Sequence, residues 1–309
     1  MADTQRVVVA GATGLIGRAL CAQLTAKGYQ VVVFSRNPAA ARRAIPSAVE
    51  YVAWTPSESG TWAAAIDGAY AVINMAGAPI IGKRWNAAYK QELRDSRIIG
   101  TRGLVRAMAA AQRKPRVFIS GSAIGYYGSR DDTPLDEQAR PGNDFLSQLV
   151  IDWEQEAAKA EQAGIRTVML RTGIVLDTEG GALKPLLLPF RLGAGGPVLP
   201  GSQYWSWIHL DDEIGLILFA LEHEQVRGPL NATAPEPLTN REFSAVLGRV
   251  LHRPSLVPVP GFAIKLLLGE VAEPLIINGQ RVIPAKAQQY GYSFKYPALE
   301  PALRQILQK

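Results

Sequence analysis

The sequence predicts an α/β fold in which a doubly wound parallel sheet is followed by a smaller C-terminal α+β part. Two observations support the sheet. Apolar, β-branched segments alternate with amphipathic segments through the first half of the chain, as in parallel strands that helices cover on both faces. A turn with three glycines joins the first of these strands to the first helix. The chain has 309 residues, of which 48% are hydrophobic and 19% charged, enough for a substantial core.

The first strand, turn and helix contain the most informative motif. Residues 7–17 read V-V-V-A-G-A-T-G-L-I-G, and the helical pattern continues to Lys27. Gly11 suits a tight turn, Gly14 allows the backbone to approach a pyrophosphate, and Gly17 lets the helix pack close to the sheet. Free N–H groups and the helix dipole favour a phosphate at the N-terminus of the helix. The alternative is a structural turn that binds no nucleotide. The predicted cofactor-binding residues of this motif are Gly11, Thr13, Gly14, Leu15, Ile16 and Gly17.

The second strand indicates which nucleotide binds. Residues 30–34 read Q-V-V-V-F and lead into Ser35, Arg36 and Asn37. An acidic residue at this strand end binds the ribose hydroxyls of NAD, whereas an arginine suits the 2′-phosphate of NADP. No Asp or Glu occurs from residue 30 to residue 48. We therefore predict NADP(H) as the cofactor, with Ser35, Arg36 and Asn37 at its adenosine end. The alternative is that Arg36 is a solvated loop residue.

The remaining elements of the first half follow in alternation. Further strands are expected at 49–54, 71–75, 116–120 and 167–171, and long helices at 85–111 and 145–163. Right-handed crossovers between such strands produce a Rossmann-type sheet, which binds ligands at the carboxyl ends of its strands.

The pattern loosens after Gly173, where glycines and prolines interrupt residues 180–205. We expect a strand at 205–209, a helix at 211–223, a short strand at 229–232, a helix at 240–251 capped by Thr239, and a last helix at 298–307. The predicted dinucleotide-binding domain covers residues 1–173, and residues 205–225 return to it. Residues 174–204 and 226–309 form the smaller substrate-binding part.

Composition argues against several classes of function. The net charge is +6, but basic residues are dispersed among acidic ones, so nucleic-acid binding is not expected. No run is long and apolar enough to span a membrane, and the first residues lack the pattern of a secretory signal. The single cysteine, Cys21, suits a reducing compartment, and no residue spacing suggests a metal site. We expect a cytoplasmic protein, monomeric or homodimeric, without a metal, nucleic-acid or membrane partner.

Several short motifs accompany the glycine turn. They are Asn74-Met75-Ala76-Gly77 after the fourth strand, Ser120-Gly121-Ser122 and Tyr126-Tyr127-Gly128 after the fifth, Gly82-Lys83-Arg84-Trp85, Ser96-Arg97, W-S-W-I-H-L-D-D at 205–212 and G-Q-R-V-I-P-A-K at 279–286. With these motifs the chain resembles the extended short-chain dehydrogenase/reductase superfamily, and more narrowly its atypical "epimerase family protein" branch, over nearly its full length. The resemblance implies a nicotinamide dinucleotide cofactor with Ala76 and Gly77 beside it. It does not specify a reaction.

One departure from that superfamily affects the chemistry. Members that transfer a hydride use a Tyr-x-x-x-Lys pair on the helix after the fifth strand, where the lysine lowers the pKa of the tyrosine. Here residues 144–154 contain neither tyrosine nor lysine, and none of the ten tyrosines of the chain has a lysine four residues later. The usual proton transfer cannot operate unchanged.

Two residues are candidates for catalysis. Ser122 occupies the position of the superfamily's catalytic serine, which hydrogen-bonds a substrate oxygen; the alternative is a strand-end residue with a structural role. Tyr126 is the candidate for the missing acid. An unassisted phenol is poorly matched to proton transfer near neutral pH, so binding or packing is the alternative for Tyr126.

Four further residues are candidates for substrate binding. Lys83 and Arg84 can hold a carboxylate or phosphate on the substrate, or they are solvated loop residues. Tyr127 follows Tyr126 on the same loop. His209 ends an aromatic strand before Asp211 and Asp212; the alternative is that it packs in the core while the aspartates cap the next helix.

The sequence therefore predicts an NADP(H)-binding protein that is an oxidoreductase or epimerase-like enzyme. Its substrate is a small molecule, for which Lys83 and Arg84 suggest an anionic group. The alternative is a non-catalytic NADP(H)-binding sensor or regulatory protein, which the absence of the Tyr-x-x-x-Lys pair favours.

Overall fold

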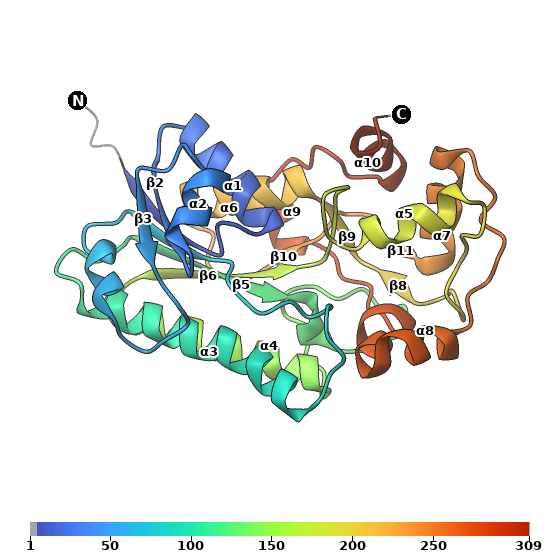
Figure 1. Ribbon diagram of the computed structural model, residues 1–309, viewed down its shortest axis with the longest axis horizontal. Coiled ribbons are helices and arrows are strands. Elements are labelled where there is room, and N and C mark those ends of the chain that lie inside the picture. Colours follow the sequence, from blue (N-terminus) through green and yellow to red (C-terminus); the bar gives the residue numbers. More distant parts are fainter. Residues whose placement is uncertain (1–4, 309) are drawn as a thin grey trace.

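The computed structural model describes residues 5–308 and confirms the α/β fold with a doubly wound parallel sheet (Figure 1). The sheet has seven strands in the order β10-β6-β5-β4-β1-β2-β3, and every neighbouring pair is parallel. The strands are β1 (Arg6–Ala10), β2 (Gln30–Ser35), β3 (Glu50–Ala53), β4 (Ala71–Asn74), β5 (Val117–Ala123), β6 (Arg166–Thr172) and β10 (Gly228–Ala232). The strand order reverses between β1 and β4, which is where open α/β sheets bind ligands.

Helices cover both faces of the sheet (Figure 1). One face carries α1 (Leu15–Ala26), α2 (Pro38–Ala44) and α6 (Leu210–Glu222), and the other carries α3 (Ala87–Ala110) and α4 (Phe145–Ala158). The valines of β1 show how the sequence requires both layers. Val7 and Val9 belong to the core beneath α1 and α6, and Val8 belongs to the core above α3 and α4. Since successive strand residues face opposite sides, a strand of valines is buried only when both faces are covered.

The second half of the chain also supplies a smaller body, which lies at the right of Figure 1. Its helices are α5 (Leu183–Arg191), α7 (Asn240–Leu251), α8 (Gly261–Leu268) and α10 (Leu299–Ile306), and its short strands are β7 (Ile174–Leu176), β8 (Tyr204–Trp205), β9 (Trp207–His209) and β11 (Leu238–Thr239). Trp205, Trp207, Phe243 and Leu303 contribute to a separate core here. The remaining elements are α9 (Ala285–Gln289), the 3₁₀-helices η1 (Thr61–Ile66), η2 (Ile124–Tyr127), η3 (Lys159–Ala163) and η4 (Gly269–Val271), and the π-helix η5 (Glu273–Ile277).

The predicted division between the two parts needs one correction. A boundary at residue 226 assigns β10 to the C-terminal part, but β10 pairs with β6 at the edge of the seven-stranded sheet, for example Leu230 with Leu170. The short helix α9 then packs on β10. After α6, the chain therefore contributes β10 to the sheet, and it returns to the sheet once more with α9. The C-terminal part is consequently assembled from separate segments of the chain.

Two predicted elements are divided in the structure. The strand expected at 205–209 is interrupted at Ser206, because Trp205 pairs with Leu238 in β11 whereas Trp207 pairs with Ile174 in β7. The helix expected at 145–163 continues beyond Ala158 only as the tighter helix η3. Among residues 5–308, no helix combines the length and hydrophobicity needed to cross a membrane.

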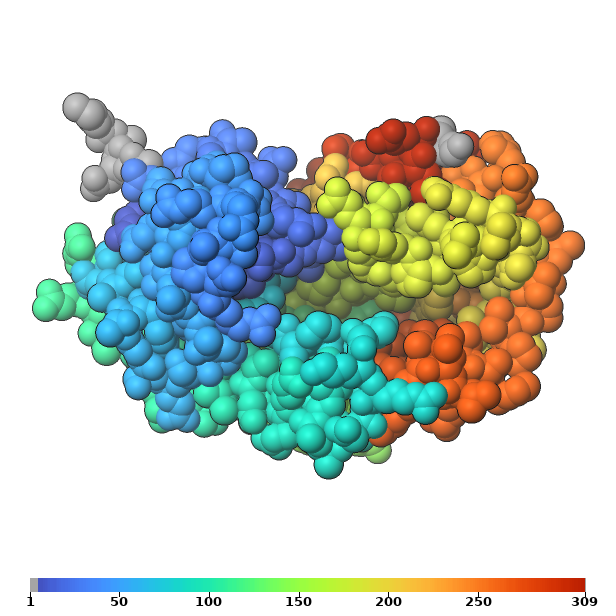
Figure 2. Space-filling view, in the orientation of Figure 1, coloured from blue at the N-terminus to red at the C-terminus, as the bar shows by residue number. Residues whose placement is uncertain are grey.

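A cleft lies between the two parts of the molecule. Figure 2 shows it between the yellow segment that includes α5 and the teal segment that leads into α3, with the orange segment around α8 beside the latter. The carboxyl ends of the sheet strands point toward the C-terminal part (Figure 1). The residues that follow these strands are therefore the ones to consider for ligand binding.

Candidate functional site

The three glycines of the first turn have different roles. Gly11 has φ of 79°, and a Cβ there would lie 2.6 Å from the carbonyl carbon of Met75. A Cβ on Gly17 would lie 2.3 Å from the carbonyl oxygen of Gly11. The chain's own packing thus requires glycine at both positions. Gly14 is exposed, and the nearest atom to its Cβ position is the Gly11 carbonyl oxygen at 3.4 Å, so the space beside it is open.

That open space lies at the N-terminus of α1. Helix α1 begins at Leu15 and has no side-chain cap, so its first N–H groups remain available to an anion. Thr13 is exposed, and Leu15 and Ile16 are half-buried in the first turn of the helix. The predicted phosphate-binding residues therefore form one surface.

At the end of β2, Arg36 has a free side chain, whereas the side chains of Ser35 and Asn37 form hydrogen bonds within the turn. Arg36 is exposed and has no ion-pair partner within the described chain. Asn37 caps α2 by accepting a hydrogen bond from the backbone N–H of Ala40 at 3.0 Å, and Ser35 Oγ accepts one from the N–H of Asn37 at 3.2 Å. The amide oxygen of Asn37 is used to start the helix, and the exposed Asn37 remains a predicted cofactor-binding residue. Arg36 is the side chain free to meet a 2′-phosphate.

The loop after β4 borders the glycine turn. The Cβ position of Gly11 lies 2.7 Å from the backbone nitrogen of Ala76, so the two loops touch. Asn74 shapes the second loop, since its Oδ1 accepts from the N–H of Ala76 at 3.2 Å and its Nδ2 donates to Thr101 at 3.1 Å. Ala76 and Gly77 thus lie at the same edge as the predicted phosphate-binding surface and remain predicted cofactor-binding residues.

Ser122 belongs to a buried ionic network. Its Oγ donates to Glu154 Oε1 at 2.6 Å, and Arg171 donates from Nε and Nη2 to the two oxygens of Glu154 at 2.8 Å each. Ser122 lies opposite Arg171 in the β5–β6 register, and Glu154 comes from α4. The exposed fractions are 5% for Ser122, 8% for Glu154 and 1% for Arg171. A bidentate ion pair of this kind offsets the cost of burying both charges.

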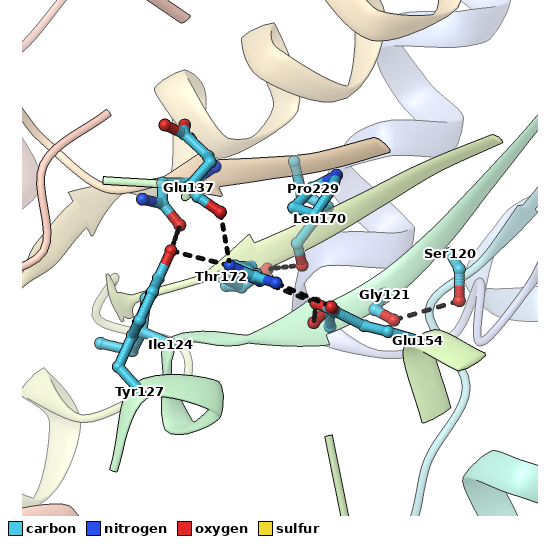
Figure 3. Close-up of polar contacts among 12 residues, drawn as sticks. Ser120, Gly121, Ile124, Tyr127, Glu137, Glu154, Leu170, Thr172 and Pro229 are labelled. Carbon is cyan, nitrogen blue, oxygen red and sulfur yellow. Dashed lines mark hydrogen bonds and ion pairs between the residues drawn. The ribbon is translucent and has the colours of Figure 1, made fainter. Parts of the chain in front are cut away.

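Arg171 extends the network to Tyr127; Figure 3 labels Tyr127, Glu137 and Glu154, which surround its guanidinium. Arg171 donates to the phenol oxygen of Tyr127 at 3.0 Å and to the backbone oxygen of Glu137 at 3.3 Å. The Tyr127 hydroxyl donates to Asn231 Oδ1 at 2.6 Å. Tyr127 is 0% exposed, and burial raises its pKa to about 12. The prediction of Tyr127 as a substrate-binding residue is therefore corrected: its hydroxyl is fully engaged inside the protein.

Tyr126 differs from Tyr127 in its surroundings. The guanidinium carbon of Arg171 lies 3.5 Å from the centre of the Tyr126 ring, a favourable cation–π contact. The Tyr126 side chain is half-buried, and its phenol forms no hydrogen bond with the residues described. Of the two tyrosines, Tyr126 is the one whose hydroxyl remains available to a ligand.

His209 has a structural role, contrary to the prediction of substrate binding. Its Nδ1 accepts from the N–H of Asp211 at 2.9 Å, and its Nε2 lies 2.8 Å from Gln305 Oε1. The ring is 3% exposed and packs on Tyr296. His209 is also the N-cap of α6, whereas Asp212 accepts backbone N–H groups from the segment before α10. The alternative is therefore right that His209 packs in the core, but wrong that the aspartates cap α6.

Lys83 and Arg84 lie on the exposed loop before α3. Lys83 Nζ is 3.2 Å from Glu92 Oε2, and Arg84 donates to the backbone oxygen of Leu266 in α8. This second contact links the loop to the C-terminal part at the cleft. Both side chains are exposed, and both remain predicted substrate-binding residues.

Sequence reasoning missed the acidic and basic partners of Ser122. Glu154 lies on α4, the helix that contains neither tyrosine nor lysine. Because Glu154 is far from Ser122 in sequence, no local pattern predicts their contact. Arg171 gives a clearer signal, because it is a charged residue that directly follows the apolar residues 168–170 in β6. A charge at such a position is buried and needs a partner.

Comparison with known proteins agrees with this geometry. The model of the NAD dependent epimerase/dehydratase family matches residues 7–232, and a domain of unknown function, DUF1731, matches residues 259–306. The chain is 40% identical over 304 residues to the chloroplastic epimerase family protein SDR39U1 homolog of Arabidopsis thaliana, covering 98% of this chain and 86% of that protein. It is 39% identical over 302 residues to epimerase family protein YfhF of Bacillus subtilis, covering 97% of each.

Solved structures extend the comparison. The crystal structure of human epimerase family protein SDR39U1 (isoform 2) with NADPH has a TM-score of 0.87 and 34% identity, and covers 99% of this chain and 100% of its own. UDP-glucuronic acid 4-epimerase from Bacillus cereus has a TM-score of 0.79 at 17% identity, covering 98% of this chain and 99% of its own, which shows a shared fold. The chain thus belongs to the NAD dependent epimerase/dehydratase family, within the branch of epimerase family proteins.

Proposed function

We propose that this protein binds NADP(H). The open space beside Gly14, the uncapped N-terminus of α1 and the unpaired Arg36 fit the phosphates of that cofactor. The human relative of similar structure was crystallised with NADPH, which supports the same choice here. We also propose a cytoplasmic location, since the single cysteine suits a reducing compartment; the Arabidopsis relative is named as chloroplastic.

We infer that the protein is an oxidoreductase or epimerase-like enzyme acting on a small substrate. The observation that carries this inference is the hydrogen bond from Ser122 to Glu154, with Arg171 holding the carboxylate. The nicotinamide, when bound, supplies or accepts a hydride. The protein must then move a proton to or from the reacting oxygen, and it has no Tyr-x-x-x-Lys pair for this step.

Ser122 and Glu154 together can move that proton. In oxidation, a substrate hydroxyl gives its proton to Ser122 Oγ while Ser122 gives its own proton to the Glu154 carboxylate. In reduction, Ser122 gives its proton to the oxygen of the reacting carbonyl and takes one from the protonated form of Glu154, which regains its proton from solvent before the next turnover. The free phenol of Tyr126 is a candidate to hydrogen-bond the same oxygen. Lys83 or Arg84 would hold an anionic group of the substrate.

The test is to follow NADPH oxidation against a panel of small carbonyl compounds. We expect Ser122→Ala to lower turnover by about 100-fold or more, because one positioned acid–base group contributes about that much. Its affinity for NADPH should stay close to that of the unaltered protein. Turnover that persists in Ser122→Ala would show that the serine is structural only.

Glu154 needs a variant that keeps the buried charge, since an unpaired Arg171 would destabilise the fold. Glu154→Asp retains the carboxylate but shortens its reach toward Ser122, and we expect reduced turnover with a changed pH profile. Glu154→Gln should be less active than Glu154→Asp. Melting temperatures of both variants report any loss of fold, and equal activity in all three proteins would contradict the relay.

A second function is a nucleotide-binding sensor without turnover. The observation that favours it is that α4 contains neither tyrosine nor lysine, while the hydroxyl of Tyr127 is already engaged by Asn231. The same titration and panel separate the two functions. Tight NADPH binding with no oxidation across the panel would support the sensor, whereas oxidation by any compound supports the enzyme.

A further inference from the structure

Arg97 is a half-buried cation that lies against the loop after β4. Its Nη2 donates to the backbone oxygen of Ala78 at 3.1 Å, and its Nη1 donates to that of Leu93 at 3.2 Å. A Cβ on Gly77 would lie only 2.9 Å from the guanidinium carbon of Arg97. The absence of a side chain at Gly77 therefore gives the guanidinium its place beside this loop.

Arg97 has no acidic partner among residues 5–308, unlike its neighbours on α3. The other cations of this helix form ion pairs: Lys90 with Glu270, Arg94 with Asp152, Arg102 with Glu156 and Arg106 with Glu58. Arg97 instead packs near the ring of Trp153, at 5.3 Å from its centre. Two backbone oxygens leave most of its five N–H donors unused. A poorly hydrated guanidinium without an anion is costly, and burial lowers the pKa of Arg97 to about 10.

Arg97 lies between two parts of the candidate site, the glycine turn before α1 and the strand that carries Ser122. On one side, Ala76 and Gly77 separate it from the glycine turn, whose Gly11 touches Ala76. On the other side, the Trp153 ring meets Gly121, with 3.0 Å between a ring carbon and the Cβ position of Gly121. Gly121 directly precedes Ser122. Arg97 thus lies between the phosphate-binding surface at α1 and the strand that carries Ser122.

We propose that Arg97 is the positively charged partner of the cofactor's diphosphate, a role that rests on the proposed binding of NADP(H). A dinucleotide that has its phosphates at the N-terminus of α1 and its nicotinamide near Ser122 passes the loop at Ala76 and Gly77. The guanidinium can supply charge and paired N–H donors to the phosphate oxygens there. Arg36 and Arg97 then have separate functions. Arg36 meets the 2′-phosphate, which only NADP(H) carries, and Arg97 meets the diphosphate, which NADP(H) and NAD(H) share.

This difference makes the proposal testable by calorimetric titration with NADPH and with NADH. We expect Arg97→Gln to weaken the binding of both dinucleotides by a similar factor, about 10- to 100-fold, as for loss of a charged hydrogen bond. Arg97→Lys keeps the charge without the fork and should restore part of the affinity. Arg102→Gln is the matched control on the same helix, and its affinities should equal those of the unaltered protein.

Salt dependence separates a phosphate contact from support of the loop. An ionic contact is screened by salt, so the affinity of the unaltered protein should fall with added salt more steeply than that of Arg97→Gln. Equal salt dependence in the two proteins would mean that Arg97 only supports the loop. If Arg97→Gln binds both dinucleotides as tightly as the unaltered protein does, the role proposed for Arg97 is wrong, while the proposed binding of NADP(H) still stands. If the unaltered protein binds neither dinucleotide, the proposed function fails and this inference fails with it.

Discussion

Arg171 and Glu154 show how a charged residue is accommodated inside this protein. Arg171 directly follows the apolar residues 168–170 in β6. Its guanidinium binds the Glu154 carboxylate through two hydrogen bonds, donates to the oxygen of Tyr127 and lies over the face of the Tyr126 ring. Removing one member of a buried pair typically costs about 3–5 kcal/mol, because the other charge is left without a partner. The network therefore fixes the position of Ser122 at the same time as it stabilises the strand.

Arg36 allows a prediction about cofactor choice. The Arg36→Asp substitution replaces a cation with an anion at the end of β2, where the 2′-phosphate of NADPH would lie. We expect the affinity for NADPH to fall by about 100-fold, from loss of a charged contact and new repulsion. The affinity for NADH should change much less, since NADH has a hydroxyl at that position. Titration with both nucleotides measures this, and an equal loss for both would refute the assignment of Arg36.

At the scale of single elements, the N-terminus of α1 differs from those of the other helices that cover the sheet. Among the five helices that cover the sheet, α2, α3, α4 and α6 each begin with a capping side chain, from Asn37, Asn86, Asp144 and His209. Helix α1 has none. Because capping satisfies the N–H groups that would otherwise face a ligand, the exception coincides with the predicted phosphate site.

Helix α7 provides a prediction about stability. Thr239 and Glu242 form a capping box, with Thr239 N–H donating to Glu242 Oε2 at 2.8 Å and Glu242 N–H donating to Thr239 Oγ1 at 3.3 Å. This helix carries Phe243, which packs on Trp205 in the C-terminal core. Thr239→Ala should lower the free energy of unfolding by about 1 kcal/mol. Urea unfolding measures the loss, Thr239→Ser is the control that keeps the hydroxyl, and equal midpoints for all three proteins would contradict the prediction.

At the scale of the whole molecule, local sequence patterns predicted the positions of helices and strands better than they predicted which elements and side chains contact one another. The apolar runs and the cap at Thr239 located strands and helices because these depend on neighbours in sequence. The place of β10 in the sheet depends on its pairing with β6, and the sequence of residues 228–232 alone does not indicate the partner strand. The same holds for the site. The glycine turn is a local motif, whereas the contact of Ser122 with Glu154 and the engagement of His209 by Gln305 arise only from tertiary packing.

Glu213 links global stability to pH. It is 0% exposed, its Oε1 accepts from Thr172 at 2.7 Å, and its Oε2 has no hydrogen-bond partner among the residues described. Burial raises the pKa of Glu213 from 4.5 to about 8. Between these two pKa values the folded protein holds a proton that the unfolded chain releases, so stability falls as the pH rises through this window. Above the folded pKa both states are ionised and the loss is complete.

Glu213→Gln tests this effect, because its amide can accept from Thr172 but does not titrate. Melting temperatures from about pH 5 to about pH 9 should fall in the unaltered protein and fall less steeply in the variant. The two curves should lie closest at the acidic end, where Glu213 is protonated and resembles glutamine in charge. At the alkaline end the variant should be the more stable protein, since it has no buried carboxylate to ionise. Parallel curves across the whole range would show that Glu213 does not titrate on folding.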